Sequence, residues 1–184
     1  MLIARTARLL LRPFEAGDLA ALAPILADPE VMRHSVRGPA DLQTTRRFIG
    51  WCQQTWQQQG LSPWALVERQ SGQLIGYCGL GPDRVEGREE LNLGYRLARS
   101  HWGQGLASEA VQASLAQGFS LPWPGSVVAI IAPEHRASQR VVEKAGFSGF
   151  AAAQFHGQPV RLYRLGRAQW LAGAAALSQV AGRS

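Results

Sequence analysis

The sequence predicts a single α/β domain in which helices flank a mixed β-sheet. Apolar segments with strand-like patterns alternate along the chain with segments of helical periodicity. No linker rich in glycine, proline or serine divides the 184 residues, and 46% hydrophobic and 17% charged residues are ordinary for a globular protein. We therefore treat residues 1–184 as one domain, with an Ala-rich tail from residue 168 that is either a terminal helix or partly disordered.

The first half of the chain carries clear signals for the ends of its elements. Asp18 is placed to cap a helix that ends before Pro29, and Gly60 is placed to end the next helix. The expected elements are a strand at 8–12, a helix at 18–28, a helix from about 41 to 60, a hairpin formed by 64–68 and 73–79, and a polar loop at 81–88.

The second half is expected to alternate strands and helices. In the strand at 90–97, Leu91, Leu93 and Tyr95 point to one face, and Glu90, Asn92 and Arg96 to the other. The further elements are a helix at 106–119, a buried strand at 127–131, a short helix at 136–145 ended by Gly146, and strands at 148–155 and 159–165. The predicted order is β-α-α-β-β-β-α-β-α-β-β.

The net charge of +6 comes almost entirely from arginine, because Lys144 is the only lysine. The arginines are scattered and form no basic stripe, so we do not expect nucleic-acid binding. A phosphate-bearing small molecule or an acidic partner explains the charge equally well. No apolar run reaches the roughly 20 residues of a membrane span, and arginines interrupt the N-terminal segment. We expect a cytoplasmic protein that contacts no membrane.

The cysteines and histidines give no sign of a disulfide framework or a metal site. Cys52 and Cys78 are isolated and are interpreted as small buried residues. The four histidines are far apart, and no pair has the spacing of metal ligands on a helix. We therefore expect no metal.

A glycine-containing segment, Trp-Gly-Gln-Gly-Leu-Ala at 102–107, lies between a predicted strand and a predicted helix. Glycines let the backbone turn and approach a ligand without a Cβ in the way. The first amides of the helix lack intrahelical acceptors, and the helix dipole adds positive potential, so the segment suits a pyrophosphate. It is not a P-loop, since it has no lysine, and Ser108 occupies the third glycine position of the dinucleotide fingerprint. Alone, the loop leaves phosphate binding and a plain tight turn equally open.

Two motifs in the right order resemble the GNAT acetyltransferase superfamily. Residues 92–97 and 102–110 contain a segment similar to the family's Q/R-x-x-G-x-G/A loop, with tryptophan at the first position. Residues 133–138, continuing as 141–147, are similar to the N-x-x-S…EK-x-GF signature. With weaker matches elsewhere, the resemblance covers about residues 8–167 and is greatest to the branch of the ribosomal-protein-alanine N-acetyltransferases.

The resemblance implies an acetyl-CoA-dependent N-acetyltransferase. The acetyl group would pass directly to a primary amine, on a protein N-terminus or a small molecule, without an acyl-enzyme. The fold implied is a mixed sheet whose central parallel strands, near 90–97 and 127–131, splay apart and admit the pantetheine arm. The residues expected to bind acetyl-CoA are Leu97, Trp102, Gly103, Gln104, Gly105, Leu106, Ala107, His135 and Ser138.

Three departures from the family pattern bear on catalysis. Asn92 stands where relatives often have glutamate; it can orient a water but cannot take a proton, which makes Glu90 the nearest candidate for a water-relayed base. A solvated strand-end glutamate is the other interpretation of Glu90. His135 replaces an asparagine and is a helix cap, a cofactor ligand or an acid/base. Val142 replaces a tyrosine that protonates the leaving thiolate, which leaves Ser138 as the donor near the thiol. The expected catalytic residues are Glu90, Asn92 and Ser138.

The acceptor cannot be identified from the sequence. Arg33 and His34 are candidates to face it, and Trp51, Trp56 and Trp64 either wall its pocket or belong to the core. The expected partners are acetyl-CoA and an amine, and a homodimer is left open. The alternative function is a catalytically weak acyl-CoA-binding or regulatory domain, suggested by the missing glutamate and tyrosine.

Overall fold

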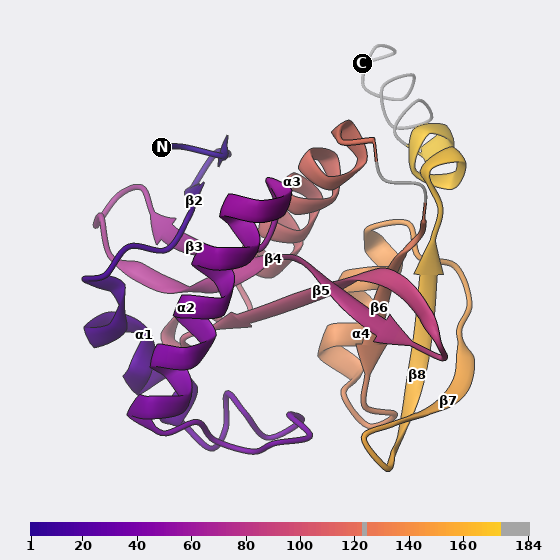
Figure 1. Cartoon of the computed structure of the whole chain (residues 1–184), viewed down its shortest axis with the longest axis horizontal. Coiled ribbons are helices and arrows are strands. Elements are labelled where there is room, and N and C mark those ends of the chain that lie inside the picture. Colours follow the sequence, from indigo (N-terminus) through magenta and orange to yellow (C-terminus); the bar gives the residue numbers. More distant parts are fainter. Residues whose placement is uncertain (123–124, 174–184) are drawn as a thin grey trace.

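The computed structural model describes residues 1–122 and 125–173 of the chain. The elements are β1 (Ala4–Arg5), β2 (Leu9–Arg12), α1 (Asp18–Ala27), α2 (Leu42–Gln59), β3 (Pro63–Glu68), β4 (Leu74–Val85), β5 (Arg88–Leu97), the 3-10 turn η1 (Arg99–His101), α3 (Leu106–Ser120), β6 (Val127–Ile131), α4 (Arg136–Lys144), β7 (Ala151–Phe155) and β8 (Gln158–Leu165). The mixed α/β fold is confirmed (Figure 1).

One eight-stranded sheet, in the order β1-β2-β3-β4-β5-β6-β8-β7, runs through the described residues. Its pairs are antiparallel except at the centre, where β5 and β6 are parallel. Parallel neighbours require a crossover connection, and here α3 supplies it. The two halves of the sheet lie on either side of this central pair (Figure 1).

Helices cover both faces of the sheet (Figure 1). On one face α1 and α2 pack on β3 and β4 through a small cluster that includes Leu22, Cys52 and Ala65. On the other, α3 and α4 pack on the central strands through the main core, which includes Leu115 and Phe147. The alternation of side chains along a strand therefore decides which of the two helical layers a residue of the sheet meets.

Most expected elements are confirmed at nearly the expected bounds, and three local corrections have physical causes. Residues 81–85 are strand rather than loop, since β4 continues to a tight turn at Glu86 and Gly87 and pairs with β5 over ten residue pairs. The N-cap of α1 is Gly17 rather than Asp18, because the Asp18 carboxylate instead binds both terminal nitrogens of Arg12 and the Glu15 amide. A two-residue strand, β1, precedes the expected first strand.

Of the Ala-rich tail, residues 167–173 are helical, and Trp170 stacks on Phe119 with ring centroids 5.7 Å apart. The rest of the predicted tail, residues 174–184, lies outside the described residues.

The central strands separate after only two paired residues. Leu91 pairs with Val127 and Asn92 with Val128, and no further pair forms between β5 and β6 in the described residues. Each strand stays in the sheet through its other neighbour: β4 pairs with β5 as far as Leu97, and β8 pairs with all of β6. The splay that the resemblance implies is therefore present.

A partly buried carboxylate ties the N-terminal segment to the start of α3. Glu109 accepts hydrogen bonds from the Thr6 hydroxyl at 2.5 Å and from the Arg8 amide at 2.8 Å, and it forms an ion pair with the Arg8 guanidinium at 2.7 Å. Arg8 also donates to the Gln104 carbonyl at 2.8 Å, which holds the glycine loop against β2. Burial alone would raise the pKa of Glu109, but these donors outweigh it and lower that pKa.

We expect Glu109→Gln to lower the free energy of unfolding at pH 7 by about 1 kcal/mol, because the amide loses the ion pair with the Arg8 guanidinium and one of the accepting oxygens. Since folding lowers this pKa, its stabilisation is present above the unfolded value of 4.5 and is lost as the pH falls through the folded value. Urea unfolding at pH 7 and pH 3 measures both effects. The matched control is Glu89→Gln, because the Glu89 side chain is exposed at the start of β5. The free energy of unfolding of this variant should stay within about 0.5 kcal/mol of the parent value. A loss for Glu109→Gln that persists at pH 3 would contradict this account.

Candidate active site

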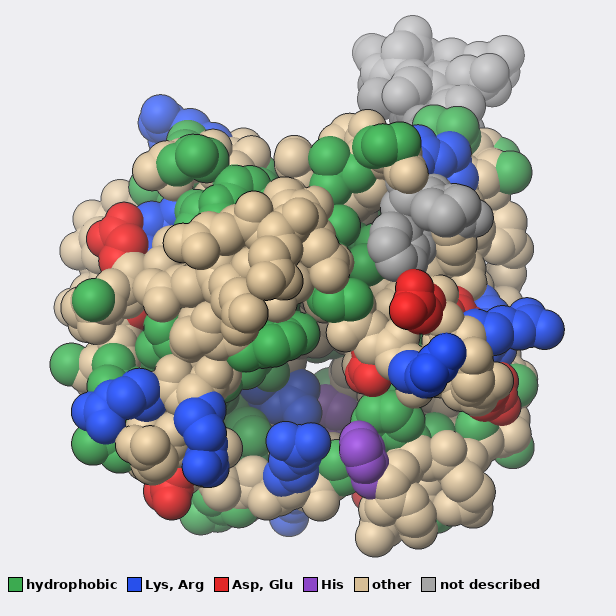
Figure 2. Space-filling view, viewed as in Figure 1, with side chains coloured by type: hydrophobic (Ala, Val, Ile, Leu, Met, Phe, Trp, Pro, Cys, Tyr) green, Lys and Arg blue, Asp and Glu red, His purple; other side chains and the backbone are tan. Residues whose placement is uncertain are grey.

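A cleft of about 520 Å³ opens where β5 and β6 separate. Figure 2 shows the centre of the molecule hollowed, with arginine or lysine and histidine side chains deep in the opening. The lining comes from four places that are distant in sequence: the turn after α1, the end of β5, the glycine loop with the start of α3, and α4. The four segments thus meet in one cavity beside the point where the strands separate.

The glycine loop offers a row of free backbone amides to this cleft. Gly103 and Gly105 have φ values of +72° and +78°, in the left-handed region that favours glycine. The first bond of α3 runs from the Glu109 amide to the Gly105 carbonyl, so the amides of Leu106, Ala107 and Ser108 have no helical acceptor. Gly105 brings no capping side chain either. The segment therefore fits a pyrophosphate.

The open edge of β5 presents backbone groups that β6 does not reach. The Tyr95 carbonyl accepts from Nη1 of Arg96 at 2.8 Å, and the Leu97 carbonyl accepts from the Trp102 indole at 2.9 Å. Backbone groups with side-chain rather than strand partners can exchange them for the amides of an extended ligand. Leu97 and Trp102 both line the cleft, as predicted.

Tyr95 and Ser138 meet across the cleft. The phenol oxygen lies 2.5 Å from Oγ of Ser138, so β5 and α4 are joined by a hydrogen bond between two hydroxyl groups. Burial raises the pKa of Tyr95 to about 12, and the bond to Ser138 only partly offsets this. The phenol is therefore protonated at neutral pH and can donate a hydrogen bond to a group held between the strands.

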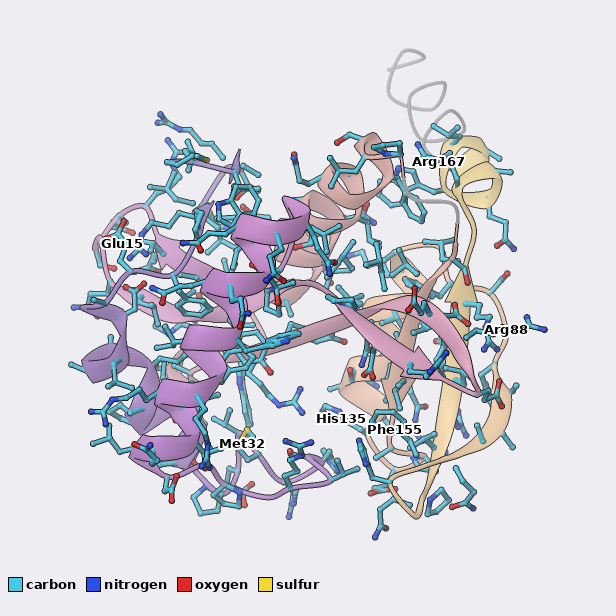
Figure 3. All side chains as sticks on the ribbon, in the orientation of Figure 1. Glu15, Met32, Arg88, His135, Phe155 and Arg167 are labelled. Atoms are coloured by element: carbon cyan, nitrogen blue, oxygen red, sulfur yellow. The ribbon has the colours of Figure 1, made fainter. Side chains whose placement is uncertain are left out.

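Two stacked histidines lie at the start of α4. The rings of His34 and His135 have centroids 4.1 Å apart and an interplanar angle of 27°. His34 also faces Glu134, with 3.5 Å between Nδ1 and Oε1. Burial, then the neighbouring His34 and Arg96, lower the pKa of His135 to about 4. Its imidazole is therefore neutral at pH 7 and lines the cleft near the centre of the molecule (Figure 3).

Further along α4, Arg140 and Lys144 line the same cleft. Four residues apart on a helix, they share one face, about 6 Å from each other along the axis. Two cations near a loop of free amides add positive potential where a polyanionic ligand would lie.

The structure separates Glu90 from the rest of the predicted site. Glu90 does not line the cleft; it is buried in the paired part of β5, before the splay. One carboxylate oxygen accepts from Ser126 at 2.5 Å, and the other pairs with Arg164 of β8 at 2.9 Å. The expectation that Glu90 lies beside the cofactor slot is thus corrected, because the central strands are still paired at that point. Its solvated alternative is corrected too, since Glu90 is 4% exposed.

Two other predicted residues also lie outside the cleft. The Asn92 amide donates to Asp83 on β4 at 3.1 Å. Gln104 points its side chain to the Ser100 carbonyl at 3.0 Å and lines a neighbouring groove. The remaining predicted residues do line the cleft: Leu97, Trp102, Gly103, Gly105, Leu106, Ala107, His135 and Ser138.

Among the further candidates, Arg33 and His34 line the cleft, and their contact with an acceptor stays a prediction. The three tryptophans do not. Trp64 is fully buried, Trp56 packs edge-on against it at 6.4 Å, and Trp51 is partly exposed.

Sequence reasoning missed four functional candidates: Tyr95, Arg96, Arg140 and Lys144. Tyr95 belongs to the Gly-Tyr pair of the first motif, and the spacing of Arg140 and Lys144 on the predicted helix was visible. Nothing in the sequence singled out Arg96, because its importance depends on a cleft between separated strands.

Comparison with known proteins decides the family. A sequence profile described as the Acetyltransferase (GNAT) domain matches residues 8–148. The chain belongs to the GNAT acetyltransferase family. It is 35% identical over 159 residues to the protein YkkB of Bacillus subtilis (strain 168), covering 86% of this chain and 92% of that protein. It is 31% identical over 144 residues to the N-acetyltransferase p20 of Bacillus licheniformis, covering 77% of this chain and 80% of that protein.

Solved structures show the same fold. An acetyltransferase from Agrobacterium tumefaciens str. C58 aligns with a TM-score of 0.75 at 28% identity, over 89% of this chain and 93% of that one. The ribosomal L7/L12 alpha-N-protein acetyltransferase RimL, in complex with coenzyme A, aligns at 0.74 with 18% identity, over 90% and 97%. Spermidine N-acetyltransferase from Vibrio cholerae aligns at 0.72 with 17% identity, over 90% and 99%. The last two likenesses concern the fold alone.

The chain is thus an acyltransferase of a family that takes its acetyl group from acetyl-CoA. The loop amides, the open edge of β5 and the cations of α4 fit the diphosphate, amide and phosphate groups of that molecule. No helix in residues 1–122 or 125–173 has the length and apolar character needed to cross a membrane.

We expect acetyl-CoA to stabilise the protein by about 2.7 kcal/mol at 100 times its Kd, and Gly105→Asp to abolish this gain. The substitution places a negative charge where we expect the diphosphate, close to the free amides at 106–108. A thermal-shift titration with acetyl-CoA measures the effect. Gly149→Asp is the matched control, because Gly149 also has a positive φ, of +70°, but lies outside the cleft. An unchanged response of Gly105→Asp to acetyl-CoA would contradict the assignment.

We expect His135 to stay neutral down to a pH near 4. Because folding lowers its pKa from 6.5, the unfolded state binds the extra proton, and the stability that this residue contributes falls as the pH drops from 6.5 towards 4. NMR titration of the histidine ring signals, assigned with His135→Gln, gives the midpoint. A His135 midpoint at or above 6 would show that the stacked pair does not exclude the charge.

Proposed function

We propose that this protein transfers the acetyl group of acetyl-CoA directly to the nitrogen of an amine acceptor. The observation that carries the proposal is the cleft through the splayed sheet, because it opens to both faces. Tyr95 points to the α3/α4 face, where it bonds Ser138, whereas Arg96 points to the opposite face. A donor held along the loop and an acceptor entering from the Arg96 side would meet between the two strands.

In this proposal Tyr95 and Ser138 stabilise the leaving group. The amine nitrogen attacks the thioester carbonyl carbon, the C–S bond breaks with its electron pair going to sulfur, and CoA departs as a thiolate. A Tyr95 pKa of about 12 lies well above that of a thiol, about 8.5. The hydroxyl pair therefore stabilises the thiolate by hydrogen bonding, and the thiolate takes its proton from solvent.

The amine reacts as the free base, and its nitrogen becomes acidic once it bonds to the carbonyl carbon; we propose that His135 accepts the proton at that point. Glu90 cannot, because its oxygens are already engaged by Ser126 and Arg164. A neutral imidazole at the rim of the cleft offers an acceptor nitrogen for the amine N–H. Because the pKa of His135 is low, the protonated ring does not persist at neutral pH, and the proton passes on to solvent.

The test is acetyl-CoA turnover against a panel of amines, followed with a thiol reagent. Both cysteines are buried and burial raises their pKa, so released CoA dominates the signal. We expect Ser138→Ala to lower kcat about 10- to 100-fold, the value of one or two hydrogen bonds to a charged group. Acetyl-CoA affinity should change little.

Glu90→Gln is the matched comparison in the same assay. We expect it to reduce stability, because it weakens the contact with Arg164, and to keep kcat within threefold once the folded fraction is equal. A 100-fold loss at neutral pH that high pH restores would instead identify Glu90 as the base. Binding of acetyl-CoA without transfer to any amine would favour the acyl-CoA-binding or regulatory alternative.

A further inference from the structure

Arg96 is a cation in the cleft without an anionic partner. Its Nη1 donates to the Tyr95 carbonyl, while its Nε is buried and faces no acceptor. Among the described residues, no aspartate or glutamate lies within ion-pair distance of its guanidinium. Leaving such a donor buried and unpaired is unfavourable, and an anionic ligand would offset this cost.

The position of Arg96 places it on the acceptor side of the cleft. Arg96 lies directly opposite Tyr77 in the antiparallel ladder of β4 and β5, so both side chains are on one face. Tyr77 packs against Phe48 of α2, with ring centroids 4.8 Å apart. Arg96 is therefore on the α1/α2 face, whereas the Tyr95–Ser138 pair is on the α3/α4 face.

The positive charge that Arg96 brings to this end of the cleft is matched by no carboxylate beside it in the part of the chain that the structure describes. Arg33 and Glu30 line the same cleft as a neighbouring pair, and the ring of His135 is neutral at pH 7. Glu30 lies 3.7 Å from Arg33, and Glu134 lies 3.5 Å from His34. A polyamine would bring several positive charges to this site and would be repelled. An acceptor that carries its own negative charge would be attracted.

We propose that the acceptor is a small amine with a carboxylate close to the reacting nitrogen, as an α-amino acid presents it, and that Arg96 binds this carboxylate. A guanidinium matches the planar geometry of a carboxylate and can hold it through two parallel hydrogen bonds. The His34–His135 stack joins the turn after α1 to α4, which favours a small molecule over a folded protein end. This inference rests on the proposed function.

The same cation favours the chemistry. A positive charge near an ammonium group disfavours the charged form and so lowers its pKa. Arg96 thus raises the share of free amine at neutral pH while it fixes the nitrogen through the neighbouring carboxylate. Such an arrangement lessens the need for the glutamate that relatives often place at Asn92.

The experiment compares free α-amino acids with the amides of the same amino acids, which keep the amine and side chain but lose the carboxylate. Spermidine and short peptides complete the panel. For the best amino acid, we expect kcat/KM at least about 30-fold above that of its amide, the effect of a charge-assisted pair. Arg96→Gln should bring the two within threefold and leave the acetyl-CoA thermal shift intact. Arg96→Lys should retain part of the preference for the amino acid over its amide. Arg46→Gln, at an exposed position of α2, should retain all of it.

Two outcomes would overturn the inference, and they are distinguishable. Equal or faster acetylation of amides, peptides or spermidine by the parent protein would reject the carboxylate-bearing acceptor while the proposed function stands. Failure to acetylate any amine, in a protein that still binds acetyl-CoA, would reject both. The comparison of amino acids with their amides in the parent protein is enough to test for a carboxylate-bearing acceptor. That test therefore stands even if Arg96→Gln is too unstable to assay.

Discussion

Strands that separate inside a sheet leave backbone groups without partners, and the functional part of this molecule is built on one such separation. After Asn92 and Val128 the ladder between β5 and β6 ends, although both strands continue. The ten pairs with β4 and the full pairing of β6 with β8 keep the two halves rigid. The opening is therefore fixed by the antiparallel ladders on either side. It exposes backbone groups of β5 and side chains of both faces to a single cavity.

Two carboxylates, Glu109 and Glu90, have structural roles outside this opening. Glu109 holds Arg8 and the N-terminal segment beside the glycine loop, and Glu90 holds Arg164 between β5 and β8. Each carboxylate compensates an arginine that would otherwise add to the positive field. Arg96 of β5 and Arg140 and Lys144 of α4 line the cleft and take part in no ion pair among the described residues. Their positive potential suits an anionic ligand.

Two ionisable side chains of the cleft, Tyr95 and His135, are neutral at pH 7. Burial raises the pKa of Tyr95 and, with nearby positive charge, lowers that of His135, so neither carries a charge in the resting protein. Neutral groups with fixed orientations can stabilise developing charge without first losing a tightly held partner. This arrangement suits a direct transfer, in which charge moves between nitrogen and sulfur without resting on the protein.

Local signals in the sequence were sufficient for much of the framework. The helix predicted from about residue 41 begins at an Asp41 cap, and Gly60 and Gly146 end their helices as predicted, because helix termini depend on neighbours a few residues away. The glycine loop was likewise recognisable from its own residues. By contrast, residues 81–85 were misjudged, since their strand conformation depends on the ladder with β5 rather than on their own polar composition.

The sequence by itself therefore determined the family, the order of the elements and the place of the loop that suits the diphosphate. The tertiary structure alone decided which polar side chains face the cleft. Glu90 does not line the cleft as expected, because its carboxylate binds Arg164, which lies 74 residues away on β8. Tyr95 and Ser138 meet across 43 residues, and Arg96 faces the cleft only because β6 has separated from β5. Contacts between distant segments depend on the packing of the whole sheet, and no local pattern of residues encodes them.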